Sequence, residues 1–441
     1  MKLLLLSFFI CFVLILEAKE PLSLEACVSF ALEHNLSLKS QQYDVLKQRL
    51  HLANAKQQFL PAISANSYYN ERFGRSIDPE TNTALTNQFF TSGFGINASL
   101  SLFEGFRRSN RIKLEKNLLE SERAGIQKAE DWLTFQIIEL YSNALFYQGI
   151  IDVIREQVDL SYRLLKRQRR MVELGQKSLL DLTDVEAQMA EDSLELERYE
   201  MEMNLAFHSL RKAMNYSLDE ELELEVFQLQ VVEAQSSNCN PVQVMLLAEK
   251  HLPQIRILEG QLKSAGLLLK ETKASLWPSL TLNIGVSSAY NETTHDPDGE
   301  TMSFSKQLDV NSGSYVGVNL SIPLFSRWCN HTNVKLAKLN NESAKQHYEE
   351  MWQQLRFDVY ENTLLLGAAL ARYKAGIKNE AKQQMAFTNG EKRLENGLIS
   401  TLDFYALENS LTHSKIERLR LSIELFLQYK TIEYYVSGTI M

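Results

Sequence analysis

Two short stretches of the chain carry a glycine, a serine and an acid at the same spacing. They are "LGQKSLLDL" at residues 174–182 and "NGLISTLDF" at residues 396–404, which lie 222 positions apart. The glycine, serine and acid are Gly175, Ser178 and Asp181 in the first stretch and Gly397, Ser400 and Asp403 in the second. Two such acids could form a carboxylate pair for hydrolysis, complement the ends of helices, or line a pore that favours cations.

The surroundings of both stretches favour the ends of helices over a hydrolytic pair. Glycine reaches the left-handed conformation that ends a helix, and a serine three residues later is a good N-cap for the next helix. The acid then falls at the third position of the first turn, near the positive end of that helix. We therefore predict two helical hairpins, with helices over 106–173, 179–214, 329–395 and 401–436.

Composition excludes several classes of protein. The 441 residues are 45% hydrophobic and 23% charged, which is typical of a globular protein. After the N-terminal stretch no apolar run of about 20 residues occurs, so a polytopic helical membrane protein is excluded. The net charge of -9 offers no basic surface for nucleic acid. No nucleophile–base pair, metal-ligand spacing or phosphate loop is present, so we predict no catalytic residue, no metal, no cofactor and no enzymatic activity.

The N-terminus and the cysteines indicate export. "MKLLLLSFFICFVLILEA" predicts a signal peptide at residues 1–18, cleaved after Ala18, and Cys11 lacks the small residues that precede a lipidated cysteine. The remaining Cys27, Cys239 and Cys329 are too widely spaced for a disulfide framework or a zinc site. We expect them to be small buried hydrophobic residues.

An internal duplication organises the chain. "KQQFLPAIS" at residues 56–64 resembles "KASLWPSLT" at residues 273–281, which places Pro61 opposite Pro278. Because the residue before a proline is pushed out of the helical region, we predict helix-to-strand switches at both prolines. The predicted divisions after the signal peptide are a first repeat over 19–214, an equatorial inter-repeat element over 215–240 and a second repeat over 241–441.

Each repeat contains two segments that alternate between apolar and small polar residues. The predicted strands span about 62–69, 92–103, 279–289 and 313–325. A transmembrane barrel with a watery lumen and a soluble half-buried sheet both show this alternation, and the signal peptide favours the barrel. Four strands cannot close a barrel, and lipid does not tolerate open sheet edges, so several chains must share one barrel.

The long helices carry a second pattern. Apolar residues follow a heptad from Leu133 to Val172, which predicts a left-handed coiled coil. A helix of roughly 100 Å cannot wrap around a compact core, so it must project.

Taken together, the signal peptide, the duplicated plan, the four strands, the proline switches and the paired Gly/Asp tips resemble the TolC-like outer-membrane efflux proteins. The resemblance implies an α+β, mainly α-helical fold in which three chains share a 12-stranded transmembrane β-barrel, continued by a long periplasmic α-helical coiled-coil barrel. It implies a passive exit duct of a tripartite efflux or type I secretion system in the outer membrane. The implied partners are a homotrimer, a periplasmic adaptor, an inner-membrane pump of the RND or ABC type, and outer-membrane lipid.

The resemblance also assigns roles to residues at the tips. It implies that Asp181 and Asp403 line the tunnel near its constriction, as periplasmic gate acids. The tips that would contact the adaptor are Leu174, Gly175, Ser178, Gly397, Leu398 and Ser400.

The resemblance has departures, and one alternative stays open. Ile399 and Leu394 stand where the type protein of the family has an arginine and a tyrosine that lock its closed state, and Ala406 replaces a second lumenal acid. The closed state here must use other contacts. The alternative function is a structural coiled-coil protein of the envelope without pore activity, which would explain the heptads but not the strands.

Overall fold

The computed structural model describes residues 21–77, 84–86, 89–220, 222–226, 240–296 and 298–439. The predicted signal peptide, Cys239 and most of the predicted inter-repeat element lie outside the described residues. The chain forms two compact units. One joins Met1–Ser40 with Gln127–Leu252 and Gln354–Met441, and the other joins Gln41–Ile126 with Pro253–Gln353. Each unit therefore takes residues from both halves of the duplication.

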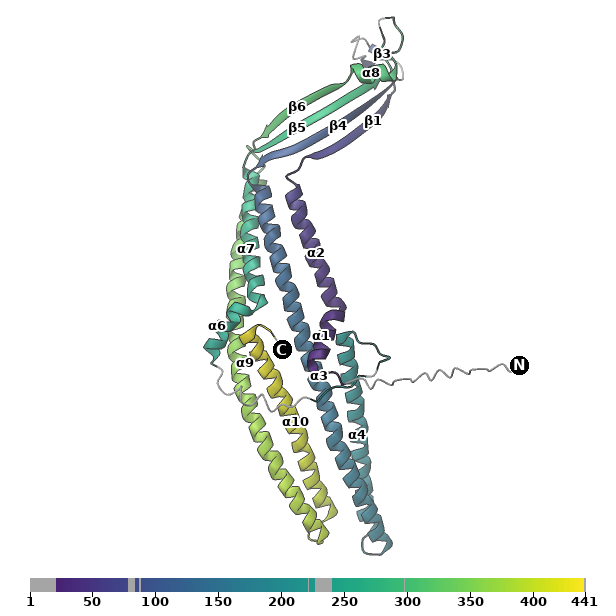
Figure 1. Cartoon of the computed structure of the whole chain (residues 1–441), viewed down its shortest axis with the longest axis vertical. Helices are drawn as coiled ribbons and strands as arrows, with labels where there is room; N and C mark the ends of the chain where they lie inside the picture. The colour runs from purple at the N-terminus through teal and green to yellow at the C-terminus, as the bar shows by residue number, and fades with distance from the viewer. Residues whose placement is uncertain are drawn as a thin grey trace, which may run out of the picture. The chain divides into compact units, whose positions relative to one another are not determined.

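The helices repeat in the order that the duplication predicts (Figure 1). The first half contains α1 (Leu24–His34), α2 (Leu36–Gln57), α3 (Arg107–Glu173) and α4 (Leu179–Met214). The second half contains α6 (Pro241–His251), α7 (Pro253–Lys273), α9 (Cys329–Glu395) and α10 (Thr401–Ser437). The predicted ends of the four long helices are confirmed to within one residue. No helix among the described residues combines the length and the apolar character that crossing a membrane requires.

Both prolines stand immediately before a strand. Pro61 precedes β1 (Ala62–Arg72), and Pro278 precedes β5 (Ser279–Asn291). On the helical side, α7 continues into the short 3-10 helix η3 (Ala274–Leu276). Proline fixes φ and restricts the residue before it, so the chain leaves the helical region at these points.

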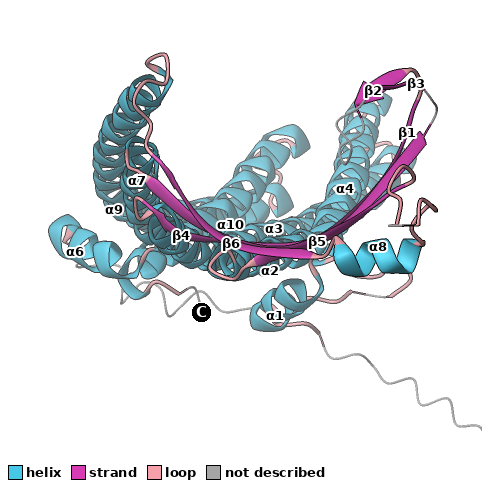
Figure 2. Ribbon diagram, turned by 90° about the horizontal axis from the view of Figure 1, so that it is seen from above, coloured by secondary structure: helices cyan, strands magenta, loops and turns pink. Residues whose placement is uncertain are grey.

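Four strands form one antiparallel sheet in the order β1–β4–β5–β6, with β4 at Phe89–Glu104 and β6 at Gly313–Ser321. Figure 2 shows the sheet as a single curved layer. Its predicted alternation is visible in β6, where Val316, Val318 and Leu320 occupy alternate positions of one face and are exposed. The strands β1 and β6 each have one neighbour among the described strands, so the sheet has two open edges.

Three features of this unit were not predicted correctly. The last strand was predicted to reach residue 325 but ends at Ser321, because Pro323 lacks the N–H that would continue the ladder. A second sheet, β2 (Arg75–Ile77) with β3 (Ala84–Thr86), and the helix α8 (Phe304–Val310) lie in segments for which no strand or helix was predicted.

Gln307 holds α8 against the sheet. Its side-chain Nε2 donates to the carbonyl oxygens of Asn291 (3.0 Å) and Met302 (2.9 Å). Its Oε1 accepts from the backbone N–H of Asn291 (2.9 Å). A single buried amide therefore orders the loop between β5 and β6.

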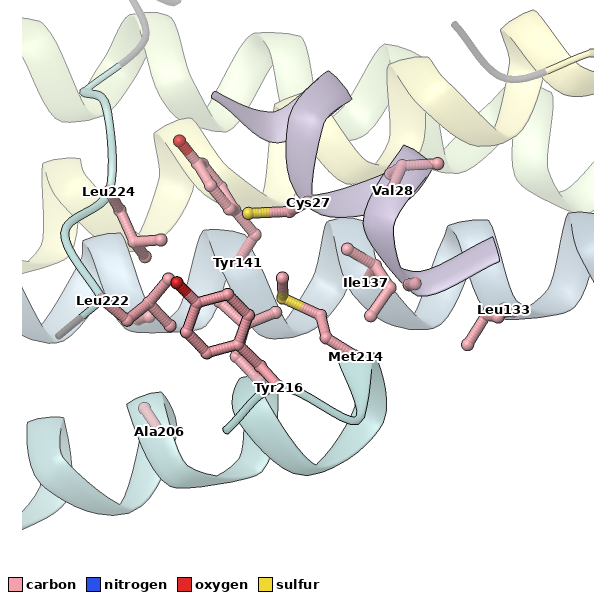
Figure 3. Close-up of a cluster of buried hydrophobic side chains, with 13 residues drawn as sticks. Cys27, Val28, Leu133, Ile137, Tyr141, Ala206, Met214, Tyr216, Leu222 and Leu224 are labelled. Carbon is pink, nitrogen blue, oxygen red and sulfur yellow. The ribbon is translucent and has the colours of Figure 1, made fainter. Parts of the chain in front are cut away.

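A buried apolar cluster joins α1, α3 and α4 to the described part of the predicted inter-repeat element (Figure 3). The hydroxyl of Tyr141 lies 3.0 Å from the carbonyl oxygen of Leu22 and 2.6 Å from that of Glu225. It thereby supports a parallel bridge between Leu22 and Leu224. The inter-repeat segment is thus fixed to the long helices where it is described.

Only one of the two described cysteines matches the prediction of burial. Cys27 is fully buried in this cluster, and burial raises the pKa of its thiol to about 12, with a further contribution from Glu25. Cys329 is exposed, so its predicted burial was wrong. It begins α9 next to the exposed Trp328.

Candidate functional site at the two hairpin tips

The first tip closes the end of α3 with its own backbone. Gly175 has a φ of 72°, in the left-handed region that the sequence predicts for it. Its N–H donates to the carbonyl oxygen of Val172 (2.9 Å), and the N–H of Gln176 donates to that of Met171 (2.8 Å). This pair of bonds satisfies carbonyls that the helix end leaves open.

The start of α4 is closed by side chains. Ser178 is the N-cap residue, and its Oγ accepts from the backbone N–H of Asp181 (3.1 Å). The Asp181 carboxylate accepts in return from the backbone N–H of Ser178 (3.2 Å). This reciprocal capping box confirms the predicted positions of both residues.

The second tip repeats this geometry. Gly397 has a φ of 69°, and its N–H donates to Leu394 (3.1 Å), while the N–H of Leu398 donates to Arg393 (2.8 Å). Ser400 and Asp403 form the same capping box, with distances of 3.0 Å and 3.2 Å. The Ser400 hydroxyl also donates to Asp403 Oδ2 (2.7 Å).

The tips keep both acids ionised at neutral pH. Hydrogen bonds from the Ser178 backbone and side chain lower the pKa of Asp181, with a smaller contribution from Lys177. Hydrogen bonds from the Ser400 side chain and backbone lower the pKa of Asp403. Asp403 is exposed and Asp181 is partly exposed, so each tip presents a negative charge to a partner that approaches it.

Exposed leucines flank the capping residues. Leu174 and Leu398, named from the sequence, are exposed. The sequence reasoning missed Leu179, Leu180 and Leu402, which are also exposed in the first turns of α4 and α10. The sequence contains a signal for them, because all three stand within two residues of a predicted N-cap serine. We call these five leucines the tip leucines.

Behind the tips, an apolar cluster joins the two hairpins. Its buried members are Leu164 and Leu165 of α3, Val185 of α4, and Phe404 and Tyr405 of α10. Leu394 and Ile399, the positions at which the sequence departs from the type protein of the family, pack against this cluster. The structure therefore places apolar contacts at these two positions.

A buried polar group lies beyond that cluster, and the sequence reasoning did not identify it. Asp192 of α4 is 1% exposed and Glu408 of α10 is 3% exposed. Gln157 of α3 donates to Asp192 (2.8 Å) and lies 3.2 Å from the side-chain oxygen of Asn409 in α10. These contacts link the two hairpins through polar side chains.

The described residues contain no group of three or more His, Cys, Asp or Glu side chains that could hold a metal ion. The tips bring together acids, capping serines and leucines, which are groups for binding and for electrostatic selection rather than for covalent chemistry.

The chain belongs to the outer membrane efflux protein family, whose profile matches residues 27–216 and 245–422. It is therefore an outer-membrane protein of a family made up of channels rather than enzymes, as the sequence predicted.

Individual relatives share much of its length at low identity. The cation efflux system protein CusC of Escherichia coli is 22% identical over 339 residues, which are 75% of this chain and 68% of that protein. The outer membrane protein TolC of Vibrio cholerae is 22% identical over 391 residues, which are 85% of this chain and 83% of that protein.

Solved structures of channels share the fold. A crystal structure of CusC aligns with a TM-score of 0.80 at 16% identity, over 94% of this chain and 92% of that one. The CmeC outer membrane channel of Campylobacter jejuni aligns with a TM-score of 0.77 at 14% identity, over 95% of this chain and 86% of that one. The predicted fold class, mainly helical with four sheet strands in each chain, is confirmed.

Proposed function

We propose that this protein is the exit duct of a tripartite efflux or type I secretion system. In this function three chains combine their sheets into one 12-stranded barrel, and the helical hairpins form a tunnel on its periplasmic side. The two open edges of the four-stranded sheet support the assembly, because backbone groups at a sheet edge need partners in lipid. Membership of the outer membrane efflux protein family supports passive conduction.

The observation that carries the proposal is the repeated, ionised carboxylate at the two hairpin tips. With three chains side by side, each chain supplies two acids, Asp181 and Asp403, to one end of the tunnel. Rings of carboxylates attract cations and repel one another. They therefore act as a selective gate that another protein opens.

The tip leucines support a docking role for the same end of the hairpins. They are exposed apolar side chains on a backbone that hydrogen bonds already hold at the end of each long helix. A periplasmic adaptor that covers them connects the duct to an inner-membrane pump of the RND or ABC type. Gly175 and Gly397 give the adaptor close access to the backbone, since neither has a side chain.

Planar-bilayer recording tests the gate. Replacing Asp181 and Asp403 by Ala is expected to weaken the preference for cations and the block by divalent ions, because the fixed charges are lost. Replacing Ser178 and Ser400 by Ala is the matched control, since it disturbs the same caps and keeps both charges. If the Asp variants keep the wild-type selectivity, both acids serve only as caps.

The assembly has a test of its own. Detergent-solubilised protein is expected to have the mass of three chains by light scattering, because one sheet has too few strands to close. A monomer that conducts would overturn the barrel. A detergent-independent rod without conductance would instead support a structural coiled-coil protein of the envelope.

A further inference from the structure

Two acids are buried where α10 of the second hairpin packs against α3 and α4 of the first. Asp192 is well solvated by protein donors, because Gln157 (2.8 Å), Gln188 (2.9 Å) and the hydroxyl of Ser161 all donate to it. Three donors suit a charged carboxylate. The interface therefore provides hydrogen-bond donors for a carboxylate at Asp192.

Glu408 is buried in a different way. Neither oxygen of its carboxyl group has a hydrogen-bond partner, although the side chain is only 3% exposed. A buried charge without partners is costly, so such a group holds its proton. Burial, with a smaller contribution from the neighbouring Asp192, raises the pKa of Glu408 to about 8, while Arg163 opposes the rise.

The cations near Glu408 are already engaged. A cavity of about 330 Å³ between α3, α9 and α10 adjoins the carboxyl group, and Arg163 and Lys415 are the cations among its lining residues. Arg163 pairs with Asp159 (3.3 Å), and Lys415 pairs with Glu156 (2.7 Å). Each positive charge is therefore balanced by an acid of its own.

The remaining ionisable groups around Glu408 are acidic or neutral. Glu391 of α9 lines the same cavity, and Asp192 approaches from α4. On α10 itself, burial raises the pKa of Tyr405 to about 12, so this side chain is neutral. An ionised Glu408 would thus meet net negative charge from the elements packed around it.

We propose that the protonation state of Glu408 controls how tightly the second hairpin packs against the first, directly behind the tips. The neutral carboxyl group is compatible with the packed interface. Loss of its proton to solvent leaves a second negative charge beside Asp192. Separation of the hairpins admits water, which solvates both charges and reduces their repulsion. That this separation opens the duct rests on the proposed function, whereas the control of packing does not.

The direction of the pH effect follows from the raised pKa. An acid that titrates at about 8 in the packed interface and near 4.5 in water favours the packed state when it is protonated. The stabilisation is complete below about pH 4.5 and is lost as the pH rises to about 8. One proton changes the ratio of packed to separated hairpins by up to about tenfold per pH unit within this range.

Hydrogen–deuterium exchange of the full-length oligomer in detergent tests the proposal. Glu408→Gln mimics the protonated side chain, and a comparison with wild type at the same pH cancels the intrinsic exchange rate. For amides in 157–165 and 404–412, the ratio of wild-type to variant exchange rates is expected to grow at least about tenfold between about pH 5.5 and about pH 7.5. A ratio that stays constant overturns the proposal.

The duplication supplies the matched control. Glu186 occupies the position 222 residues before Glu408, but it is partly exposed and pairs with Arg169 (2.9 Å). Glu186→Gln is expected to give a ratio that does not change with pH. If this variant reproduces the effect of Glu408→Gln, burial is not its cause and the proposal is overturned.

Conductance of the same variants separates the two proposals. The open probability of wild-type channels in planar bilayers is expected to rise with pH, and Glu408→Gln is expected to reduce this rise. Absence of conductance from every variant overturns the exit-duct function, while the exchange ratio still decides the control of packing.

Discussion

The two hairpin tips share a backbone and differ in what surrounds it. Gly175 and Gly397 turn the chain with nearly the same φ, and both capping boxes use the same pair of residue types. The leucines are not repeated in the same way. Leu180 and Leu402 occupy equivalent positions, but Leu174 stands opposite Asn396 and Leu398 opposite Gln176. The two repeats thus share the residues that build each tip and differ at most of the positions of the tip leucines.

The same contrast separates Glu186 from Glu408. These equivalent acids have opposite surroundings, one partly exposed in an ion pair and the other buried without a hydrogen-bond partner. Glu408 lies at a cavity lined by α3, α9 and α10, whereas Glu186 of α4 pairs with Arg169 of α3. Residues that close a helix end are therefore of the same type in both repeats. Residues between the hairpins have different surroundings in the two repeats, because their neighbours differ.

The largest effect is expected from substitutions that break the turn that the two tips share. Replacing Gly175 or Gly397 by Val should cost about 2 kcal/mol at either tip, because a β-branched residue is strained at positive φ. An added Cβ meets no atom within 4 Å at either glycine, so the cost is one of backbone alone. Hydrogen exchange of the tip amides should speed up about 30-fold in both variants. Asn at the same positions is the control, and a Val variant as protected as the Asn variant would contradict the strain.

A smaller effect should distinguish the two caps. Ser178→Ala and Ser400→Ala should each lose about 1 kcal/mol of local stability. The loss should be greater at Ser400, because the serine side-chain bond is the largest cause of the lowered pKa of Asp403, whereas the backbone bond is the largest cause for Asp181. Local opening free energies from hydrogen exchange measure both, with Thr at each position as the conservative control. Equal losses would contradict this difference between the two serine side chains.

Acidification should weaken both caps in the same range of pH. The pKa values of Asp181 and Asp403 are lowered from 3.8, so their stabilisation is present above that value and is lost as the pH falls below it. Exchange protection of the tip amides should be constant above about pH 5 and fall below about pH 4. Asp→Asn variants should show no such fall, and a fall near pH 6 would point to a different group.

The smallest effect should be at the equivalent leucines. Leu180 and Leu402 are 73% and 66% exposed, so replacing either by Ser should change the stability of the protein by less than about 0.5 kcal/mol. Thermal unfolding of each variant measures this, with the buried Leu165 of α3 replaced by Ser as the destabilising control. A large loss at one leucine alone would show that this tip is covered within the oligomer.

Local signals made much of this structure predictable. Helix ends at the tips follow from glycine, serine and aspartate within seven residues, and strand starts follow from Pro61 and Pro278. These signals act on neighbouring backbone groups, so they are readable without knowledge of the fold. The end of β6 at Ser321 could have been predicted in the same way, from Pro323.

Features that depend on distant neighbours were not predictable. The helix α8 is ordered by Gln307, whose partners are fixed by the sheet. Asp192 and Glu408 are charged residues within long charged helices, where an acid normally faces water. Their burial depends on which helices pack together, and neither the heptad nor the duplication contains that information.

The closed hydrogen bonding of the tips has a consequence for docking. A loop that orders only on contact loses conformational entropy when it binds, and its affinity is reduced accordingly. The backbone at Gly175 and Gly397 is already hydrogen-bonded to its own helices, so the tips are ordered before a partner binds. Docking is then a rigid-body encounter, in which the area and shape of the tip leucines set the affinity rather than the folding of a loop.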